Sequence, residues 1–118
     1  MMGLPSSVRI YLSTEPGDMR KGIDSLVAML RRCGADPFSG HLFVFISRRK
    51  NRAKILTWER GGFVLWYKRL ERGVFAMPRL TPAGTTAELD PGQLAMLLDG
   101  VDYSRVRRGR RWGPKRAA

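Results

Sequence analysis

Three short apolar segments, joined by links of only a few residues, constrain the fold of this chain more than any other feature. They span residues 41–47 (HLFVFIS), 53–59 (AKILTWE) and 63–70 (FVLWYKRL). Each has the length and the β-branched and aromatic content of a strand. Because links this short cannot make the crossover that parallel strands need, consecutive strands must run in opposite directions. The sequence therefore predicts a three-stranded antiparallel meander, with residues 41–47 as a central strand because they are apolar on both faces.

Two helices are predicted around the meander. The first follows a Pro-Gly turn, takes Asp18 as its N-cap and runs to about Cys33, with apolar residues at three- and four-residue spacing. The second follows Asp90, has Pro91 at its first position and ends at Gly100.

Two more segments are predicted as short strands, residues 8–12 and the TAEL segment at 86–89, the latter at a sheet edge. The expected fold is α+β: an antiparallel sheet of three to five strands, with one main helix packed on a face and a second, C-terminal helix. We expect residues 1–103 to form a single α+β domain and residues 104–118 to form a basic, flexible tail.

The charge of the chain indicates a polyanionic partner. Twenty-two Lys and Arg oppose ten Asp and Glu, which gives a net charge of +12. Each phosphate that such a side chain neutralises releases condensed counterions, so a nucleic acid is the expected partner, and the charge alone does not distinguish DNA from RNA. A solubilising surface or binding to an anionic membrane would also account for the excess of positive charge.

Residues for catalysis or metal binding are scarce. The chain has one Cys and one His, with no metal-ligand spacing and no nucleotide-binding loop. His41, at the start of an apolar strand, is expected to be a hydrogen-bonded structural residue rather than a general base. No catalytic residue, metal or cofactor is expected, and the prediction is that the protein is not an enzyme. A metal-dependent nuclease is a less favoured alternative, and its acidic candidates are Asp18, Asp24, Asp36 and Glu59.

The composition also bears on location. A single cysteine excludes an intrachain disulfide, and no apolar run approaches the roughly 20 residues of a membrane-spanning helix. The N-terminus lacks the basic and apolar regions of a signal peptide. We expect a cytoplasmic protein that makes no membrane contact and is associated with the nucleoid if it binds DNA.

Basic residues gather in two segments, residues 48–54 and 68–72. The first turn of an antiparallel meander and the end of its third strand lie at the same edge, so the two segments are expected to form one basic patch. The predicted nucleic-acid contacts are Arg48, Arg49, Lys50, Arg52, Lys54, Lys68, Arg69, Arg72, Arg20, Lys21, and the tail residues Arg107, Arg108, Arg110 and Arg111.

Aromatic residues lie in the same strands. The two-residue period puts positions 63, 65, 67 and 69 on one face and positions 64, 66, 68 and 70 on the other. One face is expected to pack on the helix, and the other can offer a ring on which a base stacks. A tryptophan in a small sheet is more often core. The candidates for stacking or for an interface are Trp66, Tyr67 and Trp112.

Four motifs resemble the Orf2-type accessory proteins, often called TnpB, of the insertion-sequence-sixty-six family. They are DMRKGIDSL (18–26), DPFSGHLFVF (36–45), KILTWERGGFVLWYKRLERGVF (54–75) and ELDPGQLAMLLDGVD (88–102). The resemblance covers residues 8–103 and implies a small bacterial protein, encoded beside a DDE-type transposase, that assists transposition. The chain departs from the family pattern at the 59–62 turn and after Phe75, where Ala76 and Met77 replace a basic residue and a tryptophan.

The leading hypothesis is therefore a non-enzymatic accessory protein of a bacterial insertion sequence. It would assist transposition by binding DNA through the basic sheet edge and the tail, mainly at phosphates and with a steep dependence on salt. The alternative is an adaptor whose exposed aromatics grip the transposase of the same element.

Overall fold

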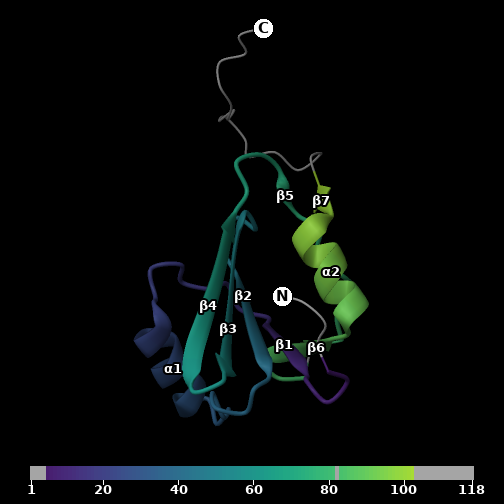
Figure 1. Ribbon diagram of the computed structural model, residues 1–118. Coiled ribbons are helices and arrows are strands. Elements are labelled where there is room, and N and C mark those ends of the chain that lie inside the picture. Colours follow the sequence, from purple (N-terminus) through teal and green to yellow (C-terminus); the bar gives the residue numbers. More distant parts are fainter. Residues whose placement is uncertain (1–4, 82, 103–118) are drawn as a thin grey trace, which may run out of the picture.

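The structure is a computed structural model and describes residues 5–81 and 83–102 (Figure 1). Its elements are β1 Ile10–Ser13, α1 Ile23–Arg32, β2 Leu42–Ile46, β3 Arg52–Glu59, β4 Gly62–Arg69, β5 Val74–Phe75, β6 Thr86–Leu89, α2 Pro91–Asp99 and β7 Val101–Asp102. The main sheet lies between the two helices, with α1 on one side and α2 on the other (Figure 1). The predicted α+β fold with two helices is confirmed.

The main sheet has the strand order β4-β3-β2-β1-β6. β2, β3 and β4 form the predicted antiparallel meander, and β6 is the predicted edge strand. One pair departs from the expected antiparallel sheet, because β1 runs parallel to β2. Helix α1 lies between these two strands in sequence and provides the crossover that a parallel pair requires. A second sheet, made by β5 and β7, was not predicted.

The predicted start of the first helix was wrong. Asp18 is not an N-cap, because residues 19–20 form a turn and α1 begins only after Gly22. The second helix begins as predicted. The Asp90 carboxylate accepts a hydrogen bond from the Gln93 backbone N–H at 2.7 Å, and the Gln93 side chain accepts one from the Asp90 N–H at 2.9 Å. This capping box fixes where the chain turns into α2.

Hydrophobic side chains pack on both faces of the main sheet. On the α1 side the buried cluster is Leu26, Leu30, Phe43, Phe45 and Leu56. The larger cluster on the α2 side includes Val44, Ile55, Phe75 and Leu97. All five residues of β2 are buried, so the prediction of a central strand that is apolar on both faces is confirmed. Neither helix in the described part of the chain is long and apolar enough to span a membrane.

Candidate nucleic-acid interface

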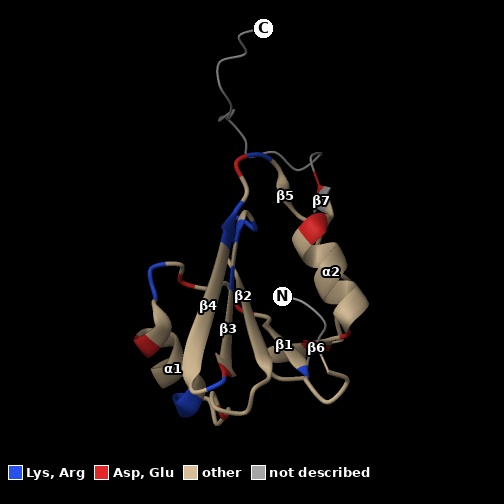
Figure 2. Ribbon diagram, in the orientation of Figure 1, with Lys and Arg blue, Asp and Glu red and all other residues tan. Residues whose placement is uncertain are grey.

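The two basic segments meet at one end of the main sheet. Arg52 and Arg69 are directly paired on neighbouring strands, and residues 48–51 form the turn that leads into β3 at Arg52. Figure 2 shows Lys and Arg residues gathered at this end of β3 and β4. The predicted joining of the two segments is therefore confirmed. We call the exposed residues of this surface the basic edge, and they are Arg48, Arg49, Lys50, Arg52, Arg69 and Arg72.

The 47–52 turn is held by a dense set of hydrogen bonds. The Ser47 hydroxyl donates to Asn51 Oδ1 at 3.2 Å and accepts from the Arg52 N–H at 3.1 Å. The N–H groups of Leu70 and Phe75 donate to the carbonyl oxygens of Asn51 and Lys50 at 2.7 and 2.8 Å. These bonds tie the tip to the end of β4 and to β5, so the exposed residues 48–50 are presented on a fixed backbone.

The charge of the basic edge is almost entirely positive. Within segments 48–54 and 68–72 the only carboxylate is Glu71. Its Oε2 accepts a 2.6 Å hydrogen bond from Arg69 Nε, and this bond raises the pKa of Arg69 above its already high ordinary value. An approaching phosphate would therefore share Arg69 with Glu71.

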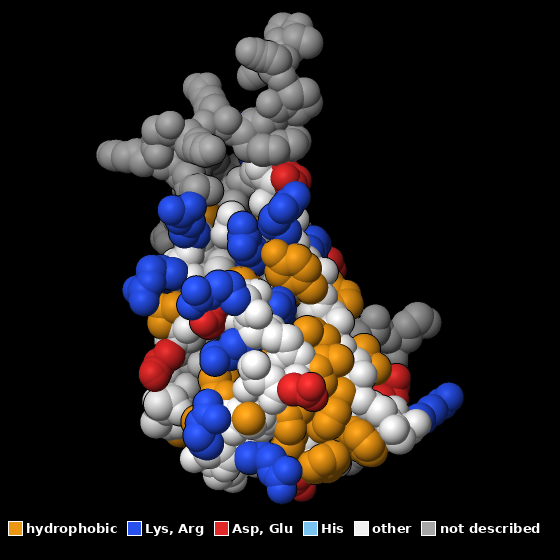
Figure 3. All heavy atoms as spheres, turned by 90° about the vertical axis from the view of Figure 1, so that its left-hand side faces the viewer, with side chains coloured by type: hydrophobic (Ala, Val, Ile, Leu, Met, Phe, Trp, Pro, Cys, Tyr) orange, Lys and Arg blue, Asp and Glu red, His pale blue; other side chains and the backbone are white. Residues whose placement is uncertain are grey.

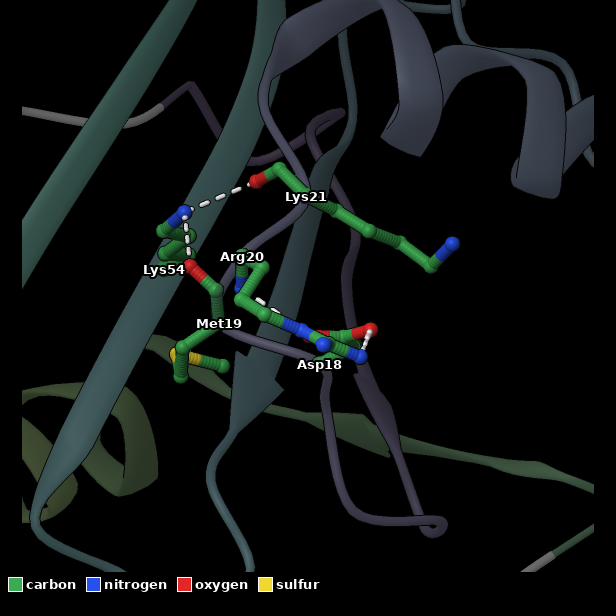
Figure 4. Close-up of polar contacts among 5 residues, drawn as sticks. All are labelled: Asp18, Met19, Arg20, Lys21 and Lys54. Carbon is green, nitrogen blue, oxygen red and sulfur yellow. Dashed lines mark hydrogen bonds and ion pairs between the residues drawn. The ribbon is translucent and has the colours of Figure 1, made fainter.

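Lys54 does not join the basic edge, contrary to expectation. Its side chain is buried, and its ammonium donates hydrogen bonds to the carbonyl oxygens of Met19 and Lys21, both at 2.7 Å (Figure 4). The same Nζ lies 5.3 Å from the centre of the Tyr67 ring. Lys54 thus fastens the turn before α1 onto β3 instead of offering its charge to a ligand.

Lys68 is also used inside the fold. Its Nζ donates a 2.9 Å hydrogen bond to the carbonyl oxygen of Leu98, in the last turn of α2. A cation at a helix C-terminus interacts favourably with the helix dipole and with carbonyl groups that lack a helical partner. Two of the predicted contacts, Lys54 and Lys68, are therefore structural tethers.

Arg20 and Lys21 lie in the turn that Lys54 fastens. Arg20 is highly exposed and forms a two-pronged pair with Asp18, with Nε 3.0 Å from Oδ1 and an Nη 3.1 Å from Oδ2 (Figure 4). Together with the Arg20 backbone N–H, this pair lowers the pKa of Asp18 from 3.8 to about 2. The carboxylate predicted as a helix cap instead orders its own turn.

The Arg20→Ala variant is expected to raise the pKa of Asp18 from about 2 toward 3.8, because the strongest hydrogen bond to the ionised carboxylate is lost. Since the folded-state pKa is depressed, the stabilisation from this pair is complete above about pH 4 and is lost as the pH falls toward 2. NMR titration of the Asp18 carboxyl carbon measures the shift, and Arg9→Ala, which removes a pair with Glu88, is the control. An Asp18 that still titrates near pH 2 without Arg20 would show that another group depresses it.

Of the aromatic candidates, Trp66 and Tyr67 lie on opposite faces of β4 and differ in burial. Trp66 packs partly buried against the α2-side core, as expected of a core tryptophan. Tyr67 projects from the opposite face of β4 and is 47% exposed. Trp112 and the tail residues Arg107, Arg108, Arg110 and Arg111 lie outside the described residues.

A cluster of three aromatic rings was missed by the sequence reasoning. Phe38, Trp58 and Phe63 contact one another with ring centres 4.9–5.2 Å apart, and Phe38 is 47% exposed. Trp58 and Phe63 are cross-strand partners near the β3–β4 turn, at the end of the meander away from the basic edge. That pairing follows from the predicted meander, but nothing in the sequence shows that the 36–40 loop brings Phe38 to it.

The sequence comparisons agree with the motifs. The family described as "IS66 Orf2 like protein" matches residues 8–108. The chain belongs to this family.

Two relatives of the IS66 Orf2-like chain come from Sinorhizobium fredii. One is "Uncharacterized protein y4jC", 34% identical over 109 residues that cover 92% of each chain. The other is "Uncharacterized protein y4hO", 36% identical over 103 residues, 85% of this chain and 88% of the relative. No solved structure matches the chain. The family identifies an insertion-sequence-associated accessory protein, as the motif resemblance implied.

Three of the polar residues considered for catalysis in this IS66 Orf2-like protein, His41, Asp18 and Asp36, have structural partners. His41 Nδ1 accepts a 3.0 Å hydrogen bond from the Arg9 N–H, which confirms the hydrogen-bonded role. Asp36 accepts a 2.9 Å hydrogen bond from the Phe38 N–H and stabilises the turn there. Asp18 and Asp36 both line a groove of about 840 Å³ between α1 and the β1–β6 side of the sheet. Within the described residues, no three His, Cys, Asp or Glu side chains gather as a metal site.

Proposed function

We propose that this IS66 Orf2-like protein is a non-enzymatic accessory factor that assists transposition by binding DNA through the basic edge. The observation that carries the proposal is the direct pairing of Arg52 with Arg69, which joins two basic segments into one surface. Arginines on a fixed backbone can meet phosphate oxygens with two hydrogen bonds each and lose little conformational freedom.

The contacts would be made to phosphates and would carry little sequence information. The exposed side chains of the basic edge are cationic, and phosphate contacts set position and affinity rather than base choice. Such binding weakens steeply as salt rises, because each neutralised phosphate releases counterions. Residues of the tail add further charge of the same sign, which suits additional phosphate contacts.

The Arg48→Ala/Arg49→Ala double variant tests this proposal. Fluorescence anisotropy with a labelled DNA duplex at several salt concentrations gives the slope of log affinity against log salt. This slope is negative, and we expect the variant to reduce its magnitude by about 2, because one phosphate contact is lost for each arginine. The absence of DNA binding by the wild-type protein near physiological salt would overturn the proposal.

A matched control comes from Arg31→Ala/Arg32→Ala. These arginines are exposed in the last turn of α1, and α1 ends away from the basic edge (Figure 1). Both double variants remove the same net charge, so a difference between them reports position rather than overall charge. Equal losses of affinity in the two would argue against a localised DNA-binding surface.

The three-ring cluster favours a second candidate function, an adaptor for the transposase of the same element. Phe38 is exposed and packs on the half-buried rings of Trp58 and Phe63, and aromatic side chains at a surface are typical anchors of protein interfaces. A Phe38→Ala variant would then bind the purified transposase more weakly than wild type, with its DNA affinity unchanged. Equal binding of the transposase by the two proteins would remove this candidate.

A further inference from the structure

We infer that the basic edge binds DNA with unpaired bases and that Tyr67 is the surface on which one of those bases stacks. This inference rests on the proposed DNA-binding function and specifies its substrate as single-stranded rather than duplex DNA. Figure 3 views the side of the molecule that carries α1 and β4, where basic side chains gather over the upper part with hydrophobic side chains among and below them.

Tyr67 lies beside the paired arginines of the basic edge. Its cross-strand partner is Lys54, and the Arg52–Arg69 pair follows two residues along on the same face of the sheet. Two residues of a strand span about 7 Å, a distance that one nucleotide can bridge. A base on the Tyr67 ring can therefore have its phosphate at Arg69 or Arg52.

The ring of Tyr67 is positioned before any ligand arrives. The Lys54 ammonium, 5.3 Å from the ring centre, is itself held by the carbonyl oxygens of Met19 and Lys21. This immobilised cation lies over one face of the ring, attracts its π electrons and limits its motion, so a base would stack on the other face. With 47% of Tyr67 exposed, the ring remains open to a partner, and little side-chain entropy is lost when a base stacks on it.

Duplex DNA cannot stack a base on the Tyr67 ring. The faces of paired bases are covered by their neighbours in the helix, so a duplex offers the basic edge mainly its phosphates. An unpaired strand exposes base faces that stack on aromatic side chains without regard to sequence. Trp66 does not provide a second platform, because it packs against the core on the opposite face of β4.

Tyr67→Ala, Tyr67→Leu and Tyr67→Phe are the variants that test the inference. Anisotropy titrations use one labelled 20-nucleotide strand, alone and annealed to its complement. Stacking contributes about 1–3 kcal/mol per base, so we expect Tyr67→Ala and Tyr67→Leu to weaken binding of the single strand at least about fivefold. Tyr67→Phe keeps a flat ring and should stay within about twofold of wild type, and duplex affinity should stay within about twofold in all three.

Thermal unfolding of each variant separates a lost contact from a lost fold, and Tyr67→Leu retains apolar packing if Tyr67→Ala is too unstable to study. Equal affinity of wild type and Tyr67→Leu for the single strand would overturn the inference, as would equal weakening on both DNA forms. Duplex binding that responds to Arg48→Ala/Arg49→Ala while Tyr67 has no effect would leave the proposed function standing and remove this inference alone. If neither DNA form binds, the proposed function itself fails.

Discussion

Phe75→Ala is expected to lower the free energy of unfolding by about 3–5 kcal/mol, the usual effect of removing a buried phenyl ring. Phe75 is 1% exposed and belongs to the α2-side core cluster. The other buried members of this cluster come from β1, β2, β3, β6 and α2, and these elements are held in place by their own pairing and packing, so they cannot collapse freely into the space. Urea denaturation followed by tryptophan fluorescence measures the change.

Removal of the Phe75 ring should also loosen the 47–52 turn of the basic edge. The backbone N–H of the same residue donates to the Lys50 carbonyl oxygen at 2.8 Å, so β5 supports the 47–52 turn. Met96→Ala is the matched control, because Met96 is a large apolar residue that is 69% exposed on α2. We expect the control to change stability by no more than about 0.5 kcal/mol. A loss below about 1.5 kcal/mol for Phe75→Ala would mean that β5 is not part of the cooperative core.

The strand pattern of the sequence was sufficient to predict the meander. Short links fix the antiparallel order of β2, β3 and β4, and that order brings the two basic segments to one edge, whereas the direct pairing of Arg52 with Arg69 is given by the structure. The same two-residue period correctly separated Trp66 from Tyr67. These features depend on local spacing, which is fully present in the sequence.

The parallel pairing of β1 with β2 could not be predicted in this way. Residues 8–12 show only weak alternation, and their partner is chosen by the packing of α1 across the sheet. The start of α1 was mispredicted for a similar reason. An Asp before an apolar stripe is a good N-cap in general. Here, however, the carbonyl oxygens of Met19 and Lys21 accept hydrogen bonds from Lys54, more than thirty residues away in the sequence.

The two basic segments were predicted to meet at one edge of the sheet, and they do, but the ammonium groups of Lys54 and Lys68 are bonded to backbone carbonyl oxygens. Sequence gives the charge of Lys54 and Lys68 and the face on which each lies. It does not show that carbonyl oxygens from the 18–22 turn and from the end of α2 reach those ammonium groups. A lysine inside an otherwise apolar strand is a signal that could have raised the question, because buried lysines require partners.

Lys54→Met is expected to lower the free energy of unfolding by about 2–4 kcal/mol, since each charge-assisted hydrogen bond contributes about 1.5–3 kcal/mol and the cost of burying the charge disappears with it. Methionine fills similar space but leaves the carbonyl oxygens of Met19 and Lys21 without their donor. The turn should then loosen, and Tyr67 should lose the cation beside its ring. Urea denaturation measures the stability, and amide hydrogen exchange of residues 18–22 should become faster than in wild type.

Arg49→Met is the control for this substitution, because it removes the same charge from an exposed position on the same β2–β3 hairpin. It should change stability by about 0.5 kcal/mol or less and should leave exchange in residues 18–22 unaltered. If Tyr67 stacks a base, Lys54→Met should also weaken single-strand binding more than duplex binding, whereas Arg49→Met should weaken both through the lost phosphate contact. A Lys54→Met protein as stable as wild type would contradict the tether.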